Sequence, residues 1–137
     1  MGRPVELGFD ECLERLRSQH RGRVAVSTPS GPHILPVPYG WVDDEVVVKT
    51  STYSVLGTYG RGTTVAFEVS GGDVSAGNAW SVVARGRAEP VVGADSLERV
   101  ASRWTAGPGW AGPESLFVRI RITELAGRLG SDEPTSP

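Results

Sequence analysis

The chain has 137 residues and a mass of 14.5 kDa, with 39% hydrophobic and 22% charged side chains, the composition of one globular domain. A formal net charge of -2, with arginines scattered along the chain, gives no reason to expect binding to nucleic acid or to an anionic membrane. One cysteine, Cys12, excludes an intramolecular disulfide, and no apolar run approaches the ~18 residues of a membrane span. We therefore expect a soluble, cytoplasmic protein.

The first half of the chain predicts one amphipathic helix followed by strands. Apolar residues recur at helical spacing within residues 9–20, and Asp10 is the expected N-cap. Pro36 and Pro38 remove N–H donors from one side of their strand, which is typical of an edge or a bulge. A short helix or an irregular crossover is expected at 52–60. The hydrophobic runs that predict strands are 23–28, 33–42 and 45–50.

The second half adds three strands and one helix. Asp95 and Glu98 have the spacing of a capping box and predict the start of that helix. The alternating runs are 64–70, 80–92 and 116–125. The result is a mainly β fold of six antiparallel strands in a closed or nearly closed barrel, with two or three short flanking helices. We expect one domain over residues 1–130 and a flexible C-terminal tail at 131–137.

The inventory of chemically active side chains is poor. Cys12, His20 and His33 do not have the spacing of metal ligands, so no metal site is predicted. No nucleophile stands in a recognisable catalytic motif, and the catalytic residues, if any, stay unassigned. Any redox chemistry would have to come from a bound cofactor.

One segment, VVVKTSTYS at 46–54, contains the only lysine of the chain beside several hydroxyls. Lys49, Thr50, Ser51 and Ser54 at a strand end supply the groups that hold a phosphomonoester in proteins. The same residues are also ordinary solvent-facing residues of a β-protein. The residues alone leave both interpretations open.

The order of segments resembles the pyridoxamine 5′-phosphate oxidase-like, FMN-binding split-barrel family, in its short actinobacterial form. The resemblance covers about residues 7 to 129, and VAFEV followed by WSVVARGRAE is its most specific pair. The matching segments are GRVAVST (22–28), GPHILPVPY (31–39), VVVKTS (46–51), VAFEV (65–69), WSVVARGRAE (80–89) and VRIRITELAGR (118–128). The family fold is a six-stranded split barrel that forms homodimers, with a flavin in each of two clefts at the dimer interface.

The resemblance assigns roles to particular residues. Lys49 matches the basic residue at the end of the third strand, and the hydroxyl residues after it match positions near the flavin phosphate. Pro36 and Val37 match the segment beside the flavin ring. Trp80 and Ser81 match the segment that approaches the cofactor across the interface. Trp110 matches a tryptophan that borders the substrate cleft.

Two positions depart from the family pattern. Val55 stands where a second phosphate-binding lysine is usual, and Pro38 stands where an asparagine is frequent. The main expectation is a homodimeric FMN-dependent oxidoreductase acting on a small organic substrate. The alternatives are a reductase using the deazaflavin F420, whose anionic tail would favour Arg61, Arg85 or Arg87, and a non-redox binding protein that has lost the flavin.

Overall fold

The computed structural model describes residues 5–107 and 114–130. Two predictions, the cleft role of Trp110 and the flexible tail at 131–137, lie outside these residues. The described elements, in chain order, are β1 (Val5–Glu6), α1 (Phe9–Arg17), β2 (Arg21–Thr28), β3 (Gly31–Val42), β4 (Glu45–Ser51), α2 (Val55–Tyr59), β5 (Thr63–Gly71), β6 (Trp80–Pro90), α3 (Ala94–Arg103) and β7 (Ser115–Leu129).

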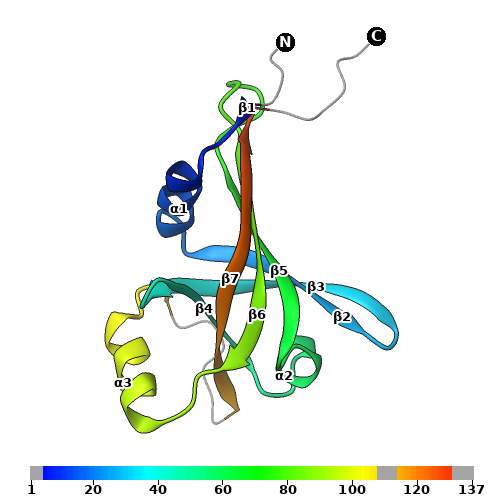
Figure 1. The fold of residues 1–137 in the computed structure, drawn as a ribbon, viewed down its shortest axis with the longest axis vertical. Helices are drawn as coiled ribbons and strands as arrows, with labels where there is room; N and C mark the ends of the chain where they lie inside the picture. The colour runs from blue at the N-terminus through cyan, green and yellow to red at the C-terminus, as the bar shows by residue number, and fades with distance from the viewer. Residues whose placement is uncertain (1–4, 108–113, 131–137) are drawn as a thin grey trace.

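The strands form one antiparallel sheet that closes on itself. Their order is β1-β7-β4-β3-β2-β5-β6, and an additional pairing of β6 with β7 joins the two sides into a six-stranded barrel. Strand β7 is the longest and runs along the height of the molecule in Figure 1, paired with β4 over residues 115–120 and with β6 from Val118 to Leu129. The predicted mainly β, six-stranded antiparallel barrel with short helices is confirmed. The two-residue β1, which pairs with the end of β7, was not predicted.

The proline-rich half of β3 lies at an edge, as its sequence indicates. Residues 31–38 pair with β2, with Pro36 opposite Arg23, whereas only residues 39–42 pair with β4. The prolines therefore occupy a stretch that is paired on one side among the described residues, where the missing N–H groups cost no ladder hydrogen bond. Asp43 and Asp44 then turn the chain into β4, with φ angles of 52° and 62°.

Alternating side chains fill the barrel. In β5 and β6 every second residue is buried, which confirms the predicted inward and outward faces of both strands. The buried rings of Tyr39 and Phe67 meet edge to face at 4.8 Å, and the Tyr39 hydroxyl donates a hydrogen bond to the Leu16 carbonyl of α1. Gly22 lies against Phe67, and a Cβ there would overlap the ring. These contacts join α1 to β2, β3 and β5.

Helix α3 covers a second, smaller core outside the barrel. Val100 and Trp104 pack over Val42, Val47 and Val91, and the Trp104 ring meets Phe117 at 5.2 Å. Trp104 is therefore part of this smaller core.

The helix caps differ from those expected. The N-caps are Gly8 for α1 and Gly93 for α3, and neither makes a side-chain cap hydrogen bond. The prediction of Asp10 as an N-cap was therefore wrong, and the capping box of Asp95 and Glu98 is absent. A glycine with positive φ at position 93, φ 92°, begins α3 two residues earlier than the sequence motif suggests.

Strand β7 also differs, because it continues to Leu129 rather than ending near residue 125. A β-bulge interrupts its register with β6 between Arg85 and Gly86, and Thr123 donates its hydroxyl to the Arg85 carbonyl there. A Cβ at Gly86 would overlap the Arg121 carbonyl, so the close approach of the two strands requires glycine. Within the described residues, no helix is both long enough and apolar enough to cross a membrane.

Candidate functional site

Lys49 lies near the end of β4, opposite Phe117 of β7. Its ammonium nitrogen is 5.6 Å from the centre of the Phe117 ring, a cation–π contact. The ammonium makes no ion pair with any carboxylate of the described residues. A cation that rests on an aromatic ring without a counter-ion is available to an incoming anion.

The hydroxyls after Lys49 are partly committed to the fold. Thr50 is 6% exposed, and its hydroxyl donates to Ser54 Oγ at 2.8 Å. Ser54 Oγ also accepts the Gly57 N–H at 3.0 Å and thereby caps α2. Ser51 Oγ accepts the Tyr53 N–H at 3.1 Å. Each serine oxygen thus acts as an acceptor internally and keeps its own proton for a ligand, whereas the Thr50 proton is already donated.

Val55 begins α2 directly after this cluster. Its side chain is partly buried and packs against the barrel core. The position where the resembling family has a second lysine is therefore filled by an apolar side chain that contributes to packing.

Pro36 and Val37 point to opposite sides of β3. Pro36 is exposed, whereas Val37 is 3% exposed and belongs to the barrel core. Only the backbone of Val37 can therefore meet a ligand outside the barrel. Pro36 lies in a row of laterally paired residues that continues through Arg23 on β2 and Glu68 on β5.

Trp80 and Ser81 begin β6 and also point to opposite faces. Trp80 is 9% exposed, and the Arg15 guanidinium of α1 lies over its ring at 5.0 Å. Trp80 thus helps to hold α1 on the barrel. Ser81 lies on the outer face, where it lines a hollow of about 630 Å³.

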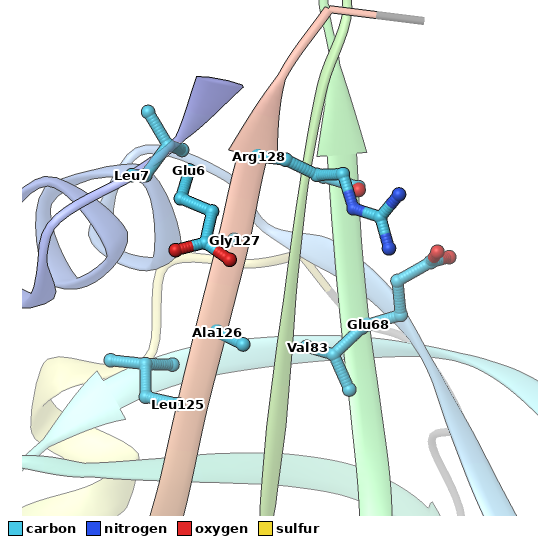
Figure 2. Close-up of a pocket in the computed structure, with 9 residues that line it drawn as sticks. Glu6, Leu7, Glu68, Val83, Leu125, Ala126, Gly127 and Arg128 are labelled. Carbon is cyan, nitrogen blue, oxygen red and sulfur yellow. The ribbon is translucent and has the colours of Figure 1, made fainter. Parts of the chain in front are cut away.

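This hollow spans the outer face of β5, β6 and β7 beside β1 (Figure 2). Its floor is made of small and apolar residues that include Val83, Ala126 and Gly127. Glu6 projects from one side, and the side chains of Glu68 and Arg128 point toward one another on the other side (Figure 2). The volume suits a cofactor or a small ligand. The alternation of β5 and β6 puts Glu68 and Val83 on the outer side of the sheet, but nothing in the sequence marks them as ligand-binding.

The two groups of predicted residues lie far apart in one chain. Lys49 is opposite Phe117 and Ser81 is opposite Arg128, so β7 separates them by about 11 positions, or ~36 Å at ~3.3 Å per residue. That exceeds the length of a mononucleotide. The structure therefore does not bring Lys49 and Ser81 together within one protomer, whereas Pro36 and Val37 lie on β3, the strand that pairs with β4 beside Lys49.

Other candidate centres are structural. Ser30 and His33 resemble a nucleophile and its base, with Ser30 Oγ 3.1 Å from His33 Nε2. However, Thr28 donates its hydroxyl to the Gly31 carbonyl, so in the 3.0 Å contact between Thr28 and Ser30 the serine is the donor. His33 Nε2 must then carry the proton and donate it to Ser30, the reverse of what a general base requires.

Neither a metal centre nor an activated thiol is present in the described part of the chain. It contains no group of three or more His, Cys, Asp or Glu side chains that could hold a metal ion. Cys12 is 1% exposed, and its burial, reinforced by Glu11, raises the pKa of its thiol. A buried thiol that resists ionisation is a poor nucleophile.

The arginines considered for a longer anionic cofactor all have internal partners. Arg61 donates Nε to the Gly57 carbonyl at 2.7 Å at the end of α2. Arg85 pairs with Glu124 at 3.3 Å, and Arg87 pairs with Glu89 at 3.0 Å. Two hydrogen bonds lower the pKa of the Glu89 carboxyl: the one from Arg87 has the larger effect, and the one from Arg119 has the smaller.

Comparisons with known proteins agree with this architecture. The family model described as pyridoxamine 5′-phosphate oxidase matches residues 9–129. A Corynebacterium glutamicum protein described as a candidate pyridoxamine 5′-phosphate oxidase is similar at 29% identity and a TM-score of 0.76, covering 95% of this chain and 96% of its own. A Corynebacterium diphtheriae protein of unknown function is similar at 26% identity and a TM-score of 0.78, covering 93% and 98%.

An FAD-binding protein from Mycobacterium smegmatis shares the fold at 24% identity and a TM-score of 0.77, covering 93% of this chain and 100% of its own. No curated protein matched the sequence.

Proposed function

Because the chain belongs to the pyridoxamine 5′-phosphate oxidase family, we propose that it binds FMN between two copies of itself and transfers hydride or electrons to a small organic substrate. One observation carries this proposal. The cation suited to the phosphate and the hollow suited to the ring lie on one barrel, but at opposite ends of β7.

The residues at the end of β4 fit a phosphate group. Lys49 offers an ammonium without a carboxylate partner in the described chain, and Ser51 and Ser54 each retain a hydroxyl proton. Charged hydrogen bonds of this kind are worth about 1.5–3 kcal/mol each. Thr50 does not contact the phosphate in this arrangement but holds Ser54, because its own proton is committed.

The hollow around Ser81 fits the flavin ring. A floor of small residues allows a planar ring to lie close to the sheet, and Ser81 supplies a hydrogen-bonding group at its edge. Solved relatives with this fold include proteins described as FAD-binding, from Mycobacterium smegmatis and Mesorhizobium loti. Their likeness, at 24% and 22% identity, supports a flavin only in combination with the family membership.

A second copy of the chain resolves the separation along β7. In a two-fold dimer the Lys49 end of one protomer can face the Ser81 hollow of its partner, and the symmetry generates two equivalent clefts. Ile34 of β3 and Val83 of β6 are apolar side chains that are 69% and 38% exposed, and such an interface would cover them.

The flavin and the protein side chains would have different roles in this reaction. A bound flavin would supply the redox chemistry, since the described residues include no group of His, Cys, Asp or Glu that could hold a metal ion. The chain's own residues would anchor the phosphate at Lys49, orient the ring over β6 and β7, and exclude water from the cleft. The substrate would be a small organic molecule that reaches the exposed side of the ring.

A second candidate function is favoured by one observation. Val55 packs against the core where a second cation is usual, so a split-barrel protein that has lost its flavin and binds another ligand in the same cleft is the alternative. An F420-dependent enzyme receives less support, because Arg61, Arg85 and Arg87 are engaged internally.

The visible absorption spectrum of the purified protein tests the proposal, followed by titration with FMN, FAD and F420. We expect FMN to bind with a change in its absorption and fluorescence. Binding of F420 alone would identify the deazaflavin alternative. A colourless protein that binds none of the three would overturn the redox proposal.

A further inference from the structure

A second cavity lies away from Lys49 and Ser81. It has a volume of about 270 Å³ and is bordered by α1, by the turn between β3 and β4, and by β7 near its bulge. In Figure 1 this region is the angle between α1, β7 and the left ends of β3 and β4. The pairing of β4 with β7 ends at Ile120 and the backbone contact of Leu7 with β7 begins at Gly127, so between these points the edge of β7 faces the cavity.

The floor of this cavity is apolar and partly aromatic. Phe9 and Leu13 follow one another by one helical turn on α1, at the edge of the apolar face that also carries the buried Cys12 and Leu16. Phe9 is 64% exposed and contributes its ring to the lining of the cavity. Trp41 forms the opposite wall, and Ile122 of β7 closes the base.

One carboxylate on the rim of the cavity makes no ion pair with the described residues. Arg121 pairs with Glu45 at 3.1 Å, and Glu124 pairs with Arg85. The Arg17 guanidinium lies over the Trp41 ring at 5.2 Å. Asp44, by contrast, makes no ion pair with the described residues, although its neighbour Asp43 is held by two arginines of α3. The lining therefore carries three carboxylates and two guanidiniums, a net charge of -1.

We propose that this cavity binds a small amine with an apolar, preferably aromatic, body. The body packs on Phe9, Leu13 and Trp41, and the ammonium pairs with the free Asp44 carboxylate at the rim. An anionic ligand would face the net negative rim, where Arg121 is already paired with Glu45 and Arg17 lies over the Trp41 ring. The cavity shares Leu125 with the hollow around Ser81, but Phe9, Trp41 and Asp44 do not line that hollow, so binding of the amine is tested separately from binding of the flavin.

Three probes with the same aromatic body distinguish the ligand classes: 2-phenylethylamine, 2-phenylethanol and 3-phenylpropanoate. Each is titrated into the full-length ¹⁵N-labelled protein, and NMR shifts are followed at Phe9, Leu13 and the Trp41 indole N–H. We expect saturable shifts with the amine, with a Kd on the order of 1 mM. The alcohol and the carboxylate should bind about three- to fivefold more weakly, the ratio of one solvent-exposed ion pair.

Two matched variants locate the ammonium. Asp44→Asn removes the free carboxylate, and asparagine tolerates the left-handed backbone at that position, so the turn is retained. Asp43→Asn makes the same change one residue away, where the carboxylate faces α3. We expect the first to lower amine affinity about three- to fivefold and to abolish the preference over the alcohol, and the second to change neither.

Phe9→Ala tests the apolar wall without endangering the core, because Phe9 is already largely exposed. It should weaken all three probes together. The proposal fails if the carboxylate binds as well as the amine, or if the Asp43 and Asp44 variants lose affinity equally. It also fails if the cavity signals respond to protein concentration and not to amine, since the cavity would then be a contact between copies.

Discussion

Replacing Val55 with lysine would restore the cation that the resembling family has beside the phosphate. Val55 is the first residue of α2 and follows Ser54, whose hydroxyl caps that helix. A new ammonium there would lie close to the groups that we assign to the phosphate. One additional charged hydrogen bond is worth about 1.5–3 kcal/mol. The site is partly open to solvent, so we take the lower end, which corresponds to about a tenfold decrease in Kd for FMN.

The same substitution has a cost in stability. It removes part of the apolar contact between Val55 and the barrel core and places a cation at a helix N-terminus, for which we expect a loss of about 1 kcal/mol in the free energy of unfolding. Quenching of flavin fluorescence measures the affinities for FMN and for riboflavin, which lacks the phosphate. The Val55→Lys variant should improve binding of FMN and leave riboflavin unchanged.

Val92→Lys is the matched control, because it adds the same charge at a residue that is 73% exposed and follows β6. If riboflavin gains as much as FMN, the phosphate is not near Val55. If the Val92 variant gains as much as the Val55 variant, the effect is one of total charge, and the assigned geometry is refuted.

Three further predictions concern the same elements. Lys49→Ala should weaken FMN about tenfold or more without affecting riboflavin, whereas Arg99→Ala, which removes an exposed cation on α3, should leave both unchanged in the same titrations. Ser54→Ala removes the cap of α2 and should lower the free energy of unfolding in urea by about 1 kcal/mol; an unchanged value would contradict the capping role. Gly22→Ala places a Cβ into a core aromatic ring and should cost about 1–3 kcal/mol, whereas Gly8→Ala, whose Cβ would have ordinary contacts, should cost less than about 1; equal losses would disprove the packing argument.

Alternation in the sequence predicted the barrel because each strand has one face in the core. The buried Val65, Phe67 and Val69 of β5 show this periodicity directly. The N-cap positions were less predictable. Gly93 adopts φ 92° and begins α3, so the side chains of Asp95 and Glu98 are not needed as a cap. The bulge near Gly86 depends on the close approach of β6 and β7, which local sequence does not encode.

The candidate site was predicted as individual residues, and its arrangement was not. Lys49 and Ser81 were both identified, but their separation along β7 depends on the register of two strand pairs. The commitment of the Thr50 hydroxyl to Ser54 likewise appears only when α2 is placed against β4. Pairings between distant segments determine which polar groups remain free, and no single segment contains that information.

Sedimentation velocity, followed at the visible absorption of the flavin, tests the central claim most directly. If FMN lies in a cleft built from two copies, the flavin absorbance should sediment with a particle of twice the 14.5 kDa chain mass. Flavin that sediments with a single chain, or that stays with the free small molecule while the protein sediments alone, would contradict the account.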